Sequence, residues 1–253
     1  MSDDLAAATT TLQGADGAAI ESYLARPVGP KSRGGVVVIH HLPGYDGSTK
    51  EIVRRFAVLG YDAICPNLYS RQAPDLDPTA ASALVREAGG ITDEQLVSDV
   101  GTAADHLRQL DSNNGKVGVI GYCSGGRQSL LAATQLDPDA AVDCYGAFVV
   151  NPPPAEYALK ATPLTDELAS LSCPLLGLFG NDDRNPGPDE VNTLEQRLRE
   201  LGKDVEFHRY DGAGHGFFSP DGAKYQVGAA TDGWSQIEQF FQRHLADSGP
   251  SGR

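Results

Sequence analysis

The chain has 253 residues, of which 40% are hydrophobic and 21% charged, and a formal net charge of −14 at pH 7. The hydrophobic share excludes a disordered chain, and the length suits one large α/β domain. The acidic excess, which no run of Lys or Arg interrupts, argues against nucleic acids and anionic membranes as partners.

The N-terminal stretch MSDDLAAATTTLQ lacks the basic start and the apolar segment of a secretion signal. No stretch approaches the length needed to cross a membrane, so we expect a cytoplasmic protein. The four cysteines are Cys65, Cys123, Cys144 and Cys173. They form no C-x-x-C pair, and we expect from them neither a metal site nor a disulfide framework.

Apolar, β-branched runs alternate along the chain with longer amphipathic stretches. The runs predict strands at 18–27, 34–41, 61–68, 116–123, 140–148, 173–180 and 204–210. The stretches predict helices at 49–60, 93–110, 124–135, 189–202 and 234–246. This order predicts an α/β fold with a mostly parallel sheet and helices on both faces. Because no repeat or linker divides the chain, we expect one domain over 1–246 and a disordered tail at 247–253.

The stretch GYCSGG places Cys123 between a predicted strand and a predicted helix. Glycines two residues before and after Cys123 allow a sharp turn with the cysteine at its apex, as in a nucleophile elbow. The N-terminus of the following helix favours a thiolate there. The pattern therefore indicates a cysteine nucleophile; the alternative is a small buried structural residue.

A nucleophilic thiol needs a base, and the base needs an orienting acid. His215 lies in the glycine-rich stretch GAGHGFF, just after the strand predicted at 204–210. The stretch NDDRNP follows the strand predicted at 173–180 and offers Asp182 and Asp183 as the acid. One of the two must be an ordinary turn residue, and the spacing alone leaves the choice open.

Five segments together resemble the dienelactone hydrolase (carboxymethylenebutenolidase) family of α/β-hydrolases: HHLPGYDG, GYDAICPNLYSRQAP, NGKVGVIGYCSGG, FGNDDRNP and YDGAGHGFF. The resemblance covers about residues 15–246. It implies the α/β-hydrolase fold, a central sheet of about seven or eight strands, and no cofactor or metal. The family's catalytic triad falls on Cys123, Asp183 and His215.

The same resemblance implies an oxyanion hole made by two backbone N–H groups, those of Leu42 and Ser124. Family members that act on dienelactone carry a glutamate where this chain has His41. An imidazole there would change how the thiol is activated. The alternative interpretation is that His40 and His41 are two polar residues ending a strand, which we prefer for His40.

Substrate binding is expected to involve arginines. The family holds the substrate carboxylate with two, one of which corresponds to Ser219 here. Arg86 is a candidate counterpart of the other, and Arg71 fits the family pattern, although it could also brace nearby carboxylates. Arg127, on the first turn after the elbow, could face the pocket or pair with an acid.

The resemblance and the residues lead to one expected function, the hydrolysis of a lactone or small carboxylic ester through an acyl-cysteine. A thioesterase or acyl transferase with the same triad is one alternative. A non-catalytic binding protein or thiol redox sensor on a hydrolase scaffold is another. We expect a small-molecule ester or lactone as the partner, and a monomer or a small homo-oligomer.

Overall fold

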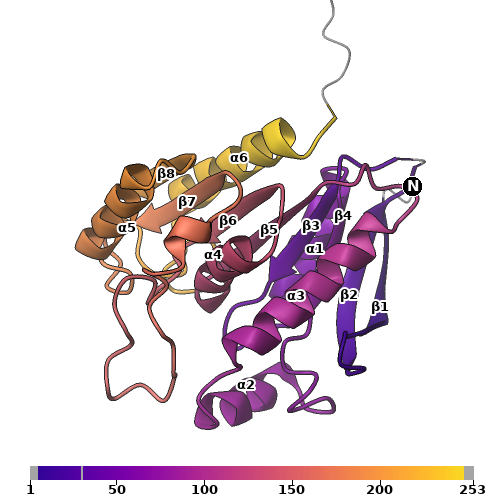
Figure 1. The fold of residues 1–253 in the computed structure, drawn as a ribbon, viewed down its shortest axis with the longest axis horizontal. Helices are drawn as coiled ribbons and strands as arrows, with labels where there is room; N and C mark the ends of the chain where they lie inside the picture. Colours follow the sequence, from indigo (N-terminus) through magenta and orange to yellow (C-terminus); the bar gives the residue numbers. More distant parts are fainter. Residues whose placement is uncertain (1–4, 30, 248–253) are drawn as a thin grey trace, which may run out of the picture.

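The strands of the chain pair in a single sheet (Figure 1). The structure is a computed structural model that describes residues 5–29 and 31–247. In this part of the chain eight strands follow the order β1-β2-β4-β3-β5-β6-β7-β8. They are β1 Leu5–Gln13, β2 Ala19–Pro27, β3 Gly35–Ile39, β4 Asp62–Pro66, β5 Val117–Tyr122, β6 Ala140–Cys144, β7 Leu175–Gly180 and β8 Val205–Tyr210.

The sheet is parallel from β4 through β8 and antiparallel at its N-terminal end. β1 pairs antiparallel with β2, and β2 pairs antiparallel with β4. All other pairings are parallel. The prediction of a mostly parallel sheet of about seven or eight strands is confirmed. The carboxyl ends of the parallel strands therefore meet along one edge, where ligands bind in such sheets.

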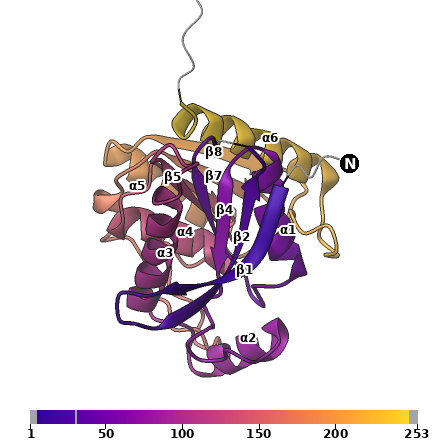
Figure 2. The ribbon, with the colours of Figure 1, turned by 90° about the vertical axis from the view of Figure 1, so that its right-hand side faces the viewer.

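Helices cover both faces of the sheet (Figures 1 and 2). They are α1 Gly47–Val58, α2 Pro78–Glu87, α3 Asp93–Arg108, α4 Ser124–Gln135, the short 3-10 turn η1 Leu168–Ser170, α5 Pro188–Glu200 and α6 Val227–His244. α1 and α6 share one face, where Phe56 and Phe241 pack with ring centroids 5.8 Å apart. The other face is covered by α3 and α4, which pack against each other.

The central strands read as continuous apolar runs because both of their faces are covered. Every residue of β3, β5, β6 and β7 is buried. The two edge strands differ: most residues of β1 are exposed, and those of β8 are half-buried. The core thus lies on both faces of the central strands. It holds in place the strand ends from which the candidate site residues project.

Some elements differ from the sequence prediction. β1 and α2 were not predicted, although Asp77 caps α2 and Pro78 occupies its first turn, a typical helix start. β6 ends at Cys144 rather than at residue 148, because Tyr145 adopts a left-handed φ of 45° that breaks the strand. α6 begins at Val227, earlier than predicted. Residues 248–253 of the expected tail lie outside the described residues.

Candidate active site

The turn between β5 and α4 has the geometry of a nucleophile elbow. Cys123 has a φ of 57° and a ψ of −121°, a strained backbone conformation at the apex of the turn. A Cβ added to Gly121 would lie 1.9 Å from the carbonyl oxygen of Gly125, and one added to Gly125 would lie 2.3 Å from that of Ile39. Only glycine fits at these two positions. The glycines therefore have the steric function predicted from their spacing.

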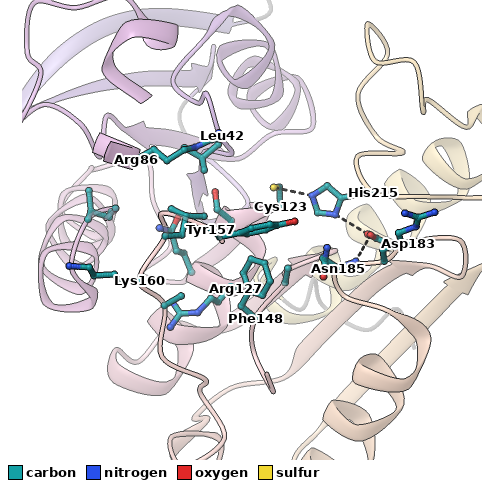
Figure 3. A pocket seen from close by; sticks show the side chains of 18 of the residues that line it. Leu42, Arg86, Cys123, Arg127, Phe148, Tyr157, Lys160, Asp183, Asn185 and His215 are labelled. Atoms are coloured by element: carbon teal, nitrogen blue, oxygen red, sulfur yellow. Dashed lines mark hydrogen bonds and ion pairs between the residues drawn. The ribbon is translucent and has the colours of Figure 1, made fainter. Parts of the chain in front are cut away.

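The structure brings Cys123, His215 and Asp183 together from three separate strand ends (Figure 3). The Nε2 atom of His215 lies 3.0 Å from the sulfur of Cys123, and its Nδ1 atom lies 2.8 Å from Oδ2 of Asp183. The backbone N–H of Asn185 donates to the other carboxylate oxygen of Asp183, over 2.9 Å. The imidazole is thus held between a thiol and a fixed carboxylate.

The choice between the two aspartates of NDDRNP is visible in the geometry. Asp183 is buried, and its carboxylate faces His215. The side chain of Asp182 is exposed, while its backbone N–H donates to the carbonyl of Ala213 over 2.9 Å. The tight turn from Gly180, where the N–H of Asp183 donates to the Gly180 carbonyl, aims the second aspartate at the histidine.

His215 sits in surroundings that favour its protonated form. Burial by itself lowers the pKa of His215, but hydrogen bonds to Asp183 and Cys123 outweigh this effect and raise it to about 10. The ring of Tyr145 packs edge-on against the imidazole, with centroids 5.2 Å apart and an interplanar angle of 64°. Tyr145 is itself buried against Phe217 and Phe218. The arrangement suits proton exchange between the thiol and the imidazole.

A cavity of about 710 Å³ opens beside this group. Cys123, His215 and Asp183 line it, together with Leu42 and Ser124. Leu42 belongs to the loop that follows β3, and Ser124 is the first residue of α4. The two residues expected to supply oxyanion N–H groups therefore border the same cavity as the thiol.

The far wall of the cavity comes from two segments on the sheet's carboxyl side. Phe148 and Tyr157 pack edge-to-face there, with centroids 5.8 Å apart. The backbone N–H of Lys160 donates to the carbonyl of Gly89 over 3.0 Å, which joins the loop carrying Tyr157 to the connection between α2 and α3. Sequence reasoning did not identify these wall residues or Tyr145; the only signal was the proline cluster NPPP at 151–154, which marks the loop.

Two of the four residues expected to bind substrate line the cavity. Arg86 is exposed at its rim. Arg127 is buried and both faces the cavity and pairs with an acid: its Nη1 and Nη2 donate to the Asp93 carboxylate over 3.2 and 3.3 Å. Its Nη2 also donates to the carbonyl of Thr162 over 2.6 Å. Arg127 thus ties the wall to the start of α3.

The other two residues do not line the cavity. His41 turns toward the start of α1, where its Nε2 lies 3.4 Å from Asp46 Oδ2 and its Nδ1 3.5 Å from the Thr49 hydroxyl. Arg71 forms ion pairs with Asp16 and Asp99. The interpretation of Arg71 as a loop arginine bracing carboxylates describes this arrangement, and the expected contacts of both residues with substrate are not made at this cavity.

Comparison with known proteins identifies the family. A model of the dienelactone hydrolase family matches residues 20–245. The chain belongs to the dienelactone hydrolase family. As a member, it is a hydrolase of the carboxylic ester and lactone class, and its eight-stranded sheet with flanking helices, seen throughout the described residues, is the α/β-hydrolase fold.

Individual relatives of this dienelactone hydrolase family member resemble nearly the whole chain. A protein from Escherichia coli (strain K12) named "putative carboxymethylenebutenolidase" is 31% identical over 256 residues, covering 96% of this chain and 89% of its own. One of the same name from Methylorubrum extorquens is 29% identical, covering 89% and 77%. The crystal structure of a "putative dienelactone hydrolase" from Klebsiella pneumoniae superposes with a TM-score of 0.81 at 29% identity, covering 94% and 98%.

Over 5–29 and 31–247, no group of three or more His, Cys, Asp or Glu side chains is arranged to hold a metal ion. Over the same residues, no helix combines the length and apolar character needed to cross a membrane.

Proposed function

We propose that this protein hydrolyses a lactone or small carboxylic ester through an acyl-cysteine intermediate on Cys123. The observation that carries the proposal is the imidazole of His215, hydrogen-bonded at once to the Cys123 sulfur at 3.0 Å and to Asp183 at 2.8 Å. A nucleophile, a base and an orienting acid in line have the geometry needed for acyl transfer. The cavity beside them leaves room for a substrate of modest size.

In the acylation step, Nε2 of His215 holds the proton that has left the thiol, and the Cys123 thiolate attacks the carbonyl carbon of the ester. Asp183 keeps the imidazole proton on Nδ1, so that Nε2 is free to accept, and stabilises the imidazolium that forms. The C–O bond then breaks, and the alcohol oxygen takes the proton from His215. In a lactone, this alcohol remains attached to the acyl group.

The negative charge that develops on the carbonyl oxygen needs donors that already point at it. The backbone N–H groups of Leu42 and Ser124 are the proposed pair, because both residues border the cavity beside Cys123. Ser124 begins α4, so its N–H is one of the unpaired donors of a helix N-terminus. Losing one such donor typically lowers the rate about a hundred- to a thousand-fold.

In the deacylation step, a water molecule attacks the acyl-cysteine. His215 takes a proton from the water, whose oxygen attacks the thioester carbonyl. The C–S bond breaks, the acid leaves, and the sulfur of Cys123 recovers the proton from His215. The thiol proton leaves with the alcohol in the first step and is replaced by a proton from water in the second, so the site returns to its starting state without a cofactor.

The charges around the cavity bear on the substrate. Four basic side chains line it without a carboxylate partner among the described residues: Arg86, Lys160, Arg184 and Lys224. In a chain of net charge −14, the cavity lining carries five Lys or Arg side chains, with Arg127 included, against three Asp side chains. It favours an ester or lactone that carries a negative charge at a distance from the reacting carbonyl. The aromatic wall of Phe148 and Tyr157 suits a flat or apolar body.

The deciding experiment compares wild type with Cys123→Ala on two substrate sets. One set is neutral p-nitrophenyl esters of increasing acyl length, and the other is cis- and trans-dienelactone. We expect turnover by wild type and its loss in Cys123→Ala, with an unchanged circular-dichroism spectrum. Cys173→Ala removes another cysteine that does not line the cavity and serves as the matched control.

The outcomes separate the function from its details. Equal turnover by Cys123→Ala and wild type contradicts the cysteine mechanism. Turnover of neutral esters alone supports the mechanism but rules out the negative charge on the substrate. Fast turnover of dienelactone supports both the cysteine mechanism and a negatively charged substrate. The basic residues that line the cavity would then be the next to substitute.

A further inference from the structure

His40 stands directly after β3, two residues before Leu42, and is almost completely buried, with 2% of its surface exposed. Both of its ring nitrogens contact backbone. Its Nε2 accepts the N–H of Leu68 over 3.2 Å, and its Nδ1 lies 3.0 Å from the carbonyl oxygen of His41. Since an N–H can only donate and a carbonyl can only accept, the ring carries its proton on Nδ1 and is neutral.

The carbonyl that His40 contacts belongs to the peptide group between His41 and Leu42, whose N–H is one of the proposed oxyanion donors. The C=O of His41 and the N–H of Leu42 lie at opposite sides of the same planar peptide unit. A hydrogen bond donated to the carbonyl fixes the plane of that unit and therefore the direction of the N–H. Chains of hydrogen bonds also polarise one another, so the donation makes the Leu42 N–H a stronger donor.

Close packing holds the ring in this position. Gly44 has a φ of 68°, and a Cβ at that residue would lie 1.9 Å from Nδ1 of His40 and 2.1 Å from the His41 carbonyl oxygen. The loop is therefore wrapped tightly against the imidazole. On another side, the ring of Tyr69 packs against it with centroids 4.8 Å apart at 74°. The ring has no room to turn away from the His41 carbonyl.

We propose that His40 is a positioning residue of the oxyanion hole, which orients and polarises the peptide group whose N–H donates at Leu42. The inference rests on the proposed function, because it takes Leu42 as one of the two oxyanion donors. His40 touches neither the substrate nor the thiol: it acts through the 41–42 peptide. A strand-end residue that only filled space would need the bulk of the ring but not its two nitrogens.

The neutral state of the ring agrees with this role. Burial lowers the pKa of His40 to about 4. A second proton would go to Nε2 and point an N–H at the N–H of Leu68. At neutral pH the ring therefore keeps one donor and one acceptor, as the two backbone contacts require.

The test uses His40→Leu, which keeps a side chain of similar bulk without hydrogen-bonding atoms. Two rates are measured on the same preparation. The first is turnover of p-nitrophenyl butyrate, which needs the oxyanion hole. The second is alkylation of Cys123 by iodoacetamide, in which sulfur displaces iodide and no oxyanion forms. We expect kcat to fall about 10- to 100-fold, a partial loss of one donor, with KM and the alkylation rate unchanged.

Two amide variants act as matched controls. The amide nitrogen of His40→Asn takes the place of Nδ1 and can donate to the His41 carbonyl. The longer side chain of His40→Gln reaches toward Leu68 instead. We expect the kcat of His40→Asn to be within about threefold of the wild-type value. The kcat of His40→Gln should stay close to that of His40→Leu. If His40→Leu does not fold, the comparison of Asn with Gln decides the question.

The inference is overturned if folded His40→Leu keeps the wild-type kcat, if alkylation falls together with turnover, or if Asn rescues no better than Gln. Failure of the proposed function looks different, because wild type itself would then show no turnover that depends on Cys123.

Discussion

Asp183→Asn tests the electrostatics of the site with a change of one atom. The Asn185 N–H donates to Oδ1 of Asp183, and Oδ2 faces Nδ1 of His215. In the variant, the amide oxygen continues to accept from Asn185, so the amide nitrogen faces the imidazole. Nδ1 must then become an acceptor, and the ring proton moves to Nε2. A protonated Nε2 facing Cys123 cannot take the thiol proton.

The size of the effect follows from the contact. A hydrogen bond between charged groups contributes about 1.5–3 kcal/mol, which corresponds to about one to two pH units. The Asp183 side chain is only 2% exposed, so solvent screens the interaction little. We expect the pKa of His215 to fall from about 10 by at least about one unit. The wrong tautomer should lower kcat/KM about 10²- to 10⁴-fold.

The assay is a nuclear magnetic resonance titration of ¹⁵N-histidine-labelled protein, combined with turnover of p-nitrophenyl butyrate at neutral pH. Asp182→Asn is the matched control, because it removes the neighbouring, exposed carboxylate that does not contact His215. The control should titrate and turn over like wild type. An unchanged His215 titration and unchanged turnover in Asp183→Asn would mean that Asp183 neither fixes the tautomer of His215 nor stabilises its charged form.

Three further outcomes follow from the structure. Burial raises the pKa of Asp143 from 3.8 to about 7. The folded state therefore keeps a proton that the unfolded state loses between those values, and stability declines as the pH rises through this window. Asp143→Asn has no carboxyl group to ionise, so this decline in stability is absent from the variant. Its unfolding free energy in urea should exceed that of wild type by on the order of 2–4 kcal/mol at pH 8. An equal pH dependence of the unfolding free energy in the two proteins would contradict the assignment to Asp143. Gly125→Ala places a Cβ 2.3 Å from the Ile39 carbonyl oxygen and should cost at least about 2 kcal/mol of stability, seen as a lower Tm. Arg86→Ala and Lys160→Ala should each raise KM for dienelactone several-fold while leaving neutral esters unaffected, and equal effects on both substrates would show that rim charge is not the cause.

The local features of the site were predictable from the sequence. The GYCSGG pattern, with an apolar run before it and a helical pattern after it, predicts a strand, a sharp turn and a helix from neighbouring residues, and Cys123 takes the strained backbone of such a turn. His215 follows β8 as Cys123 follows β5, and both strands belong to the parallel part of the sheet. The carboxyl ends of parallel strands lie along one edge, so the two residues were expected on the same side. Spacing could not choose between Asp182 and Asp183, which depends on the direction of a single turn.

The partners of the polar side chains could not be predicted from the sequence. His41 turns toward Asp46, and Arg71 finds carboxylates on the β1–β2 turn and on α3, far from it in the chain. Such partners are fixed only when the elements pack. The contact of Tyr145 with His215 was also not predicted. The strand was predicted to continue to residue 148, whereas the chain turns at Tyr145 and directs its ring toward the imidazole.

Trapping the acyl-enzyme shows directly whether Cys123 is the nucleophile. Wild type is mixed with p-nitrophenyl butyrate, quenched in acid within the first turnovers, and examined by intact-protein and peptide mass spectrometry. If Cys123 is the nucleophile, wild type gains the mass of one butyryl group, located on Cys123 and absent from Cys123→Ala. Turnover without any acyl adduct on Cys123, or with the adduct on another residue, would contradict this role of Cys123.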